Sequence, residues 1–142
     1  MKRFEFQYET LATRAKREER DSATRLAQQI DAHSEACQRI ASIRSERRRA
    51  LEFLESPDVT HRRFLSGFLE ASGEELATAH AHVEECASMI EEARTNLQHT
   101  RIERRRFDRL RERAHQEHKD TAARISERAM DEIAMRLPSA GS

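Results

Sequence analysis

The chain has 142 residues, of which 37% are charged and 37% apolar, and 26 basic side chains balance 26 acidic ones. The scarcity of glycine, proline and aromatic residues excludes a densely packed globular core and favours long solvated helices. A net charge of zero excludes attraction to nucleic acid or to a membrane surface through the overall field of the protein.

Targeting and membrane signals are absent from the sequence as it stands. No stretch of about 18 consecutive apolar residues occurs, so we expect no transmembrane span. The opening residues Met1 to Phe4 lack the apolar core of a secretory signal, and we therefore expect a cytoplasmic protein. Cys37 and Cys86 stand at helical core spacing and are interpreted as small apolar residues in a reducing compartment.

The first predicted helix covers about residues 4–54. Steps of three and four residues along it mark a heptad seam, the pattern of a helix that pairs with another helix. The predicted seam consists of Leu26, Ile30, His33, Cys37, Ile40, Arg44, Arg47, Leu51 and Leu54. Between Leu11 and Leu26 the pattern needs an extra four-residue step, a stutter that locally relaxes a supercoil. The histidine and arginines in this seam predict a weak pairing.

A loop is predicted at residues 55–60. Pro57 disfavours helix at Ser56, and Ser56, Asp58 and Thr60 are residue types that cap helices. Because so short a connection makes its flanking helices antiparallel neighbours, the sequence predicts a helical hairpin.

The second predicted helix covers about residues 61–137 and would be roughly 110 Å long at 1.5 Å per residue. Its seam is Leu65, Leu69, Leu76, Ala79, Val83, Cys86, Ile90, Ala93 and Leu97. This phase passes unbroken through Gly67 and Gly73, so we predict one continuous helix. From about His115 onward the helix exceeds its partner, and we expect this overhang to fold fully only against another protein.

The predicted fold is therefore all-α. Residues 1–142 are expected to form a single antiparallel coiled-coil hairpin, with a longer second helix that ends in a C-terminal overhang and a short disordered tail at 138–142. Two registers, one heptad apart, satisfy the pairing. One aligns Leu54 with Leu69, Ile40 with Val83 and Cys37 with Cys86. The other aligns Leu51 with Leu65, Ile40 with Leu76 and Cys37 with Ala79.

Sites of chemistry are not apparent, and we expect no catalytic, cofactor-binding or metal-binding residues. His115 and His118 share a helical face, but they lack the acidic or cysteine neighbours that a metal site needs. The arginines between Arg101 and Arg113 could serve as a basic collar for an acidic partner or nucleic acid. Interleaved Glu103, Asp108 and Glu112 and the lack of stacking aromatics favour a solvated face or a protein contact instead.

Both ends of the sequence carry distinctive motifs. The opening motif is Phe4-x-Phe6-x-x-x-x-Leu11-x-x-Arg14, followed by Glu18-Glu19-x-Asp21 and Ala23. The closing motifs are Arg104-Arg105-Arg106-Phe107-x-x-Leu110-x-x-Arg113 and Glu127-x-x-x-Met130-Asp131-Glu132-Ile133-Ala134-x-Arg136. Together these motifs resemble those of the FliJ family of flagellar type III export proteins. The resemblance spans nearly the whole chain, although the middle is generic coiled coil and the family often carries a lysine in the basic stretch.

The resemblance implies a non-enzymatic protein that acts as the central stalk of the hexameric export ATPase. It also implies contact with the cytoplasmic domain of the export gate membrane protein and with export substrate chaperones. The protein would be cytoplasmic and peripherally associated with the inner membrane at the flagellar base, without inserting into it. The candidate ATPase contacts are Phe4, Leu11, Arg113, Ile125, Met130, Asp131, Glu132, Ile133 and Arg136. The candidate gate contacts are Phe64, Leu65, Phe68 and Leu69.

Two alternatives stay open at the level of sequence. Stalk proteins of virulence-type secretion systems are built alike and could carry the same pattern. A generic coiled-coil scaffold, or a nucleic-acid-binding protein that uses the arginine cluster, would explain the composition without any export function.

Overall fold

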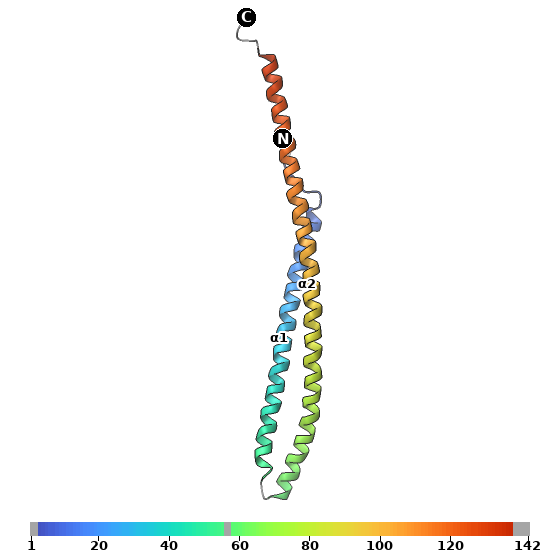
Figure 1. Cartoon of the computed structure of the whole chain (residues 1–142), viewed down its shortest axis with the longest axis vertical. Helices are drawn as coiled ribbons and strands as arrows, with labels where there is room; N and C mark the ends of the chain where they lie inside the picture. The colour runs from blue at the N-terminus through green and yellow to red at the C-terminus, as the bar shows by residue number, and fades with distance from the viewer. Residues whose placement is uncertain (1–2, 56–57, 138–142) are drawn as a thin grey trace. The chain divides into compact units, whose positions relative to one another are not determined.

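The computed structural model describes residues 3–55 and 58–137. Over these residues the chain forms helix α1, Glu9–Phe53, and helix α2, Val59–Arg136 (Figure 1). The prediction of an all-α hairpin with a longer second helix is confirmed, since α2 has 78 residues and α1 has 45. Ser56 and Pro57 of the predicted loop, and the predicted tail at 138–142, lie outside the described residues.

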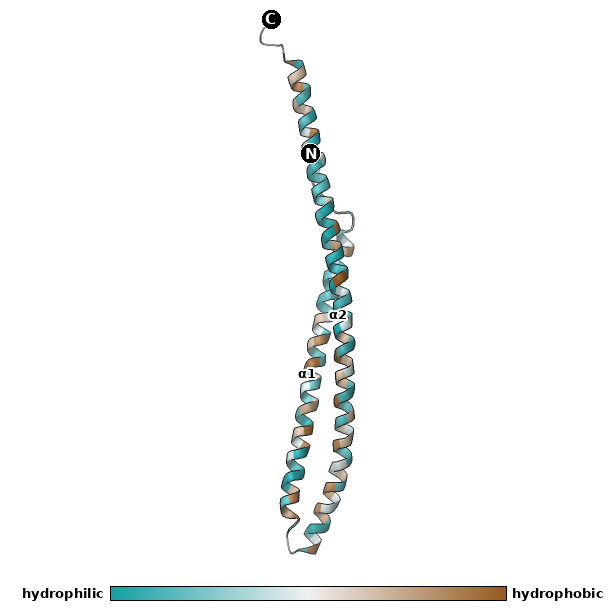
Figure 2. Cartoon of the chain, viewed as in Figure 1, coloured by the Kyte–Doolittle hydropathy of each residue, from teal (hydrophilic) through white to brown (hydrophobic). Residues whose placement is uncertain are grey.

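The contacts between the helices divide into two compact units. Unit 1 comprises Met1–Glu19 together with His99–Ser142, and unit 2 comprises Arg20–Gln98. Each unit contains part of α1 and part of α2, and unit 2 includes the connection between them. Hydrophilic residues prevail along both helices, with hydrophobic residues at intervals (Figure 2), as expected where only a narrow stripe is covered.

A tertiary contact precedes the start of α1, and a local hydrogen bond caps the start of α2. The sequence predicts a first helix from about residue 4, whereas α1 begins at Glu9. Residues 3–8 are not helical, and Phe4 instead packs edge-on against His115 and His118. At the start of α2, the carboxylate of Asp58 accepts a hydrogen bond of 3.0 Å from the Thr60 amide, as predicted for a capping residue.

The covered stripe of α1 differs from the predicted seam. Most of its buried and half-buried residues, with Leu54 just past its end, follow uninterrupted steps of three and four, and half-buried Ala32 and Ser45 lie beside this stripe. The stripe is Ala12, Ala15, Glu19, Ser22, Leu26, Gln29, His33, Ala36, Ile40, Ile43, Arg47, Ala50 and Leu54. The predicted seam members Ile30, Cys37 and Leu51 are exposed, and no stutter interrupts the phase. The physical reason is that small side chains at several positions of the stripe, among them Ala15, Ala36 and Ala50, let the two helices approach closely.

The seam of α2 is confirmed. Leu65, Cys86, Ala93 and Leu97 are buried, and the other predicted members are half-buried. Ser72 occupies the seam position between Leu69 and Leu76, and α2 passes through Gly73 without a break.

Contacts within unit 2 decide the register. The carboxylate of Glu75 accepts a hydrogen bond from the Arg39 guanidinium, and Ala36 and Ala79 line one shallow depression. These contacts fit the alignment that sets Ile40 level with Leu76, and they exclude the alignment one heptad away.

The two glycines of α2 provide a matched test of this packing. Nothing lies within 4 Å of a Cβ built at Gly67, so Gly67→Ala should raise the free energy of unfolding by about 1 kcal/mol through helix propensity. A Cβ at Gly73 would lie 3.3 Å from Nη1 of Arg47 and would displace its guanidinium, which offsets that gain by about 1 kcal/mol. Urea unfolding followed by circular dichroism measures both, and equal stabilisation would contradict the assigned packing.

Candidate functional site

The C-terminal part of α2 has no cover within the described residues. Ala122 is the last half-buried residue, and every residue of 123–137, here called the bare segment, is exposed. Its large apolar side chains are Ile125, Met130, Ile133, Met135 and Leu137, each 59% exposed or more. A single uncovered helix of this length is marginal in water, and a group of exposed apolar side chains of this kind is a candidate contact surface.

The bare segment also presents charged groups predicted to make contacts. Asp131, Glu132 and Arg136 are all exposed. Within the described residues, Asp131 and Glu132 have no ion-pair partner. The carboxylates are therefore available to a partner without first breaking an internal contact.

Residues 3–8, here called the strap, lie against α2 within unit 1. The Phe4 ring centroid is 4.7 Å from that of His115 and 5.5 Å from that of His118, both edge-on. Phe4, Tyr8, Leu110 and Arg113 line one surface cavity, so two predicted contact residues, Phe4 and Arg113, come together. Leu11, also predicted, is exposed near the start of α1.

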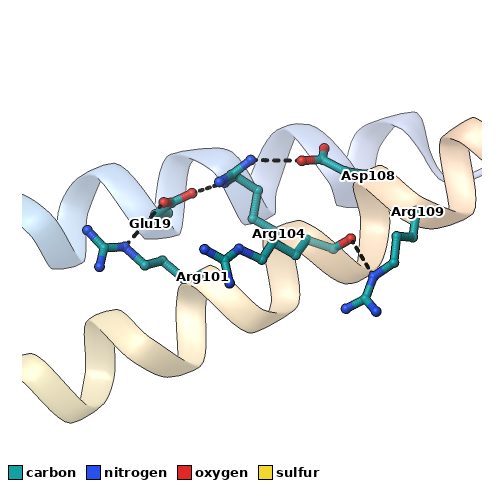
Figure 3. A network of polar contacts seen from close by, with 6 residues as sticks. Glu19, Arg101, Arg104, Asp108 and Arg109 are labelled. Atoms are coloured by element: carbon teal, nitrogen blue, oxygen red, sulfur yellow. Dashed lines mark hydrogen bonds and ion pairs between the residues drawn. The ribbon is translucent and has the colours of Figure 1, made fainter.

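The arginine cluster is largely engaged in ion pairs within unit 1. Glu19, whose side chain is 20% exposed, accepts contacts from Arg101 at 3.7 Å and from Arg104 (Figure 3). Arg104 also bonds Asp108 at 2.7 Å. Arg111 pairs with Glu9 at 3.3 Å. Several of these arginines therefore connect α2 to α1, a use that the sequence pattern did not reveal.

A second exposed apolar surface lies beside the connection between the helices, in unit 2. Phe64 is 73% exposed, whereas Leu65 is 7% exposed and belongs to the seam. Phe68 and Leu69 are half-buried. Phe53 and Val59, which sequence reasoning missed, are also exposed. The sequence could have indicated their exposure, because Phe53 and Val59 are apolar residues that flank the loop and lie off the heptad positions. Phe53, Val59 and Phe64 are called the tip surface below.

Two kinds of feature are missing from the part of the chain that the structure describes. Across 3–55 and 58–137, neither helix has a stretch long and apolar enough to cross a membrane. The same part of the chain holds no group of three or more His, Cys, Asp or Glu side chains placed to bind a metal ion.

Comparison with known families gives one decisive result. The family model described as flagellar FliJ protein matches residues 4–141. The chain belongs to the FliJ family. No curated protein and no solved structure matches it significantly. The match covers the strap, both helices and the bare segment.

Membership of the FliJ family identifies a flagellar, export-related protein. It favours the flagellar interpretation over a virulence-type secretion system.

Glu18, the neighbour of Glu19 on α1, provides a matched control for a test of the Glu19 contacts. Glu19→Gln should lower the free energy of unfolding by about 1–2 kcal/mol, because the carboxylate that accepts from two arginines becomes neutral. Glu18 pairs only with Arg14 on the exposed face of α1, so Glu18→Gln should cost roughly 0.3–0.5 kcal/mol. Urea unfolding of both variants at low and high salt checks the difference, and equal costs would contradict a bridging role for Glu19.

Proposed function

We propose that this FliJ-family protein is the central stalk of the hexameric export ATPase and connects that ring to the export gate and to substrate chaperones. The observation that carries the proposal is the bare segment, a helix with exposed apolar groups and available carboxylates. The proposal accounts for a second helix that continues far past its partner.

The large apolar side chains of the bare segment form one broad stripe with a single outlier. At about 100° per residue, Ile125, Ile133, Leu137 and Met130 fall within one arc of about 140°. Met135 falls on the opposite side of the helix. A broad apolar stripe on a single helix is expected to be covered by another protein. A ring that encloses the segment would contact both the stripe and Met135.

The strap and its neighbours extend the proposed ATPase contact. Phe4 holds the strap on α2 beside Arg113, and Leu11 is exposed on α1. These groups and the bare segment all belong to unit 1, so a partner that binds one group can reach the others. In this proposal Asp131, Glu132, Arg113 and Arg136 provide the charged contacts.

The tip surface is proposed to meet the cytoplasmic domain of the export gate. Phe64 is the principal contact because it is the most exposed of the four predicted residues. Buried Leu65 holds this part of α2 in the seam. Phe68 and Leu69, which are half-buried, add their exposed atoms to the proposed gate contact. We propose that substrate chaperones are bound by the same protein and that it acts in the cytoplasm at the flagellar base.

Charge reversal in the bare segment tests the ATPase contact. Asp131→Lys with Glu132→Lys should weaken binding to the purified hexameric ATPase roughly tenfold or more, because two attractive contacts become repulsive. Stimulation of ATP hydrolysis should fall in parallel while helicity is unchanged.

A matched control for this reversal is Glu84→Lys with Glu85→Lys, which makes the same charge change on another exposed part of α2. This control should bind and stimulate like the unmodified protein. Normal stimulation by the Asp131 and Glu132 variant, or normal motility of a strain lacking the protein, would overturn the stalk proposal.

The tip surface is tested separately. Phe64→Ala should weaken binding to the cytoplasmic gate domain roughly tenfold, as expected for an exposed aromatic anchor, and leave ATPase stimulation unchanged. Ile102→Ala, an exposed apolar residue of unit 1, is the control. Calorimetry with the isolated gate domain measures both variants, and equal affinities would remove Phe64 from the interface.

A further inference from the structure

A charged residue occupies the seam of unit 2. Arg47 is half-buried at a position where the heptad pattern calls for an apolar side chain. Its Nη1 donates a hydrogen bond of 2.8 Å to Oγ of Ser72 and another to the backbone carbonyl of Leu69. The guanidinium is therefore held by acceptors on α2.

The surface of α2 is shaped to receive this guanidinium. Ser72 is only 4% exposed, and its hydroxyl in turn donates to the carbonyl of Leu69 at 3.2 Å. The next residue is Gly73, where any Cβ would come within 3.3 Å of Nη1 of Arg47. A hydroxyl acceptor, a carbonyl acceptor and a missing side chain thus meet at one place, which we call the Arg47 notch.

The Arg47 notch distinguishes the two helix alignments, one heptad apart, which the apolar pattern alone cannot tell apart. Sliding α1 by one heptad would set Arg47 level with Leu76 instead of Leu69. The next seam position there is Ala79, and neither side chain can accept a hydrogen bond. The nearby Thr78 is exposed, and its hydroxyl already donates to the carbonyl of Glu74. The guanidinium would meet the backbone carbonyl of Leu76 in place of that of Leu69, but it would lose the Ser72 hydroxyl. It would also meet the Cβ of His80 where Gly73 has none, so a partly desolvated charge would lose a hydrogen bond and its space, which is unfavourable.

We propose that Arg47, Ser72 and Gly73 are positioning residues that specify the register of the hairpin. A single polar contact in a coiled-coil seam can fix register in this way. The consequence concerns the tip surface. In the slipped alignment Leu54 would be level with Leu69, so α1 would end before it reached Leu65, and Leu65 would lose its cover. The notch thereby determines how the start of α2 is held, whichever partner the protein binds.

Disulfide trapping in the full chain reports the two registers separately. The observed register is reported by Ala36→Cys with Ala79→Cys, in a chain that also carries Cys37→Ser and Cys86→Ser. The slipped register is reported by Ala36→Cys with the native Cys86, in a chain that carries Cys37→Ser. Initial rates of intramolecular cross-linking are measured under mild oxidation at low protein concentration, with the bridged peptides mapped after proteolysis.

With native Arg47, only the reporter of the observed register should cross-link rapidly. Arg47→Leu should raise the rate of the slipped-register reporter at least roughly tenfold, because the apolar side chain is accommodated in both alignments. Ser72→Ala should raise it by a smaller factor. Arg44→Leu is the control, since Arg44 is an exposed arginine on the same helix, with Nη2 3.4 Å from Nε2 of His80, and this change should leave the slipped-register reporter slow.

An unchanged slow rate in Arg47→Leu would overturn the proposal and assign the register to the connection between the helices. Loss of helicity in Arg47→Leu would overturn it as well, because the proposal requires that leucine support the pairing in either alignment. Neither result depends on the ATPase or gate assays. The register proposal can therefore be wrong while the proposed function is right, and the reverse is also true.

Discussion

The pairing of two narrow stripes of small side chains is the interaction on which the rest of the structure depends. Alanine, serine and cysteine contribute many of the buried seam positions, and within the described residues no large side chain is completely buried. Because small side chains remove little apolar area from water, the hydrophobic contribution of each seam layer is modest. The helices can be long and well formed while their association stays weak.

Polar contacts compensate for this weak seam in both units. In unit 1 Glu19 accepts from arginines of α2, and in unit 2 Arg47 donates to Leu69 and Ser72. Such contacts add little to stability unless their partners are aligned, but they penalise every misaligned state. A seam of small residues with a few polar contacts therefore specifies one arrangement without making the hairpin rigidly stable.

Because the seam is narrow, it leaves apolar side chains elsewhere on the helices uncovered. Past Ala122, α2 has no partner within the described residues, and most of its large apolar groups form one broad exposed stripe. The tip surface offers aromatic and aliphatic groups that the seam does not use. Binding groups outside the core of the hairpin would let the proposed partners of this FliJ-family protein bind without opening it.

The sequence by itself determined the helices, their antiparallel pairing, the seam of α2 and the uncovered C-terminal segment. Heptad spacing and the break near Pro57 carry that information locally. The tertiary structure alone decided which of two adjacent stripes of α1 is covered, because Ala36, Ile43 and Ala50 permit a closer approach than Cys37, Arg44 and Leu51. It also decided the start of α1 at Glu9, since Phe4 packs on histidines more than a hundred positions away. Register, too, required the structure: a heptad pattern shifted by seven residues matches itself, whereas the contacts of Arg39 and Arg47 across the seam distinguish the two alignments.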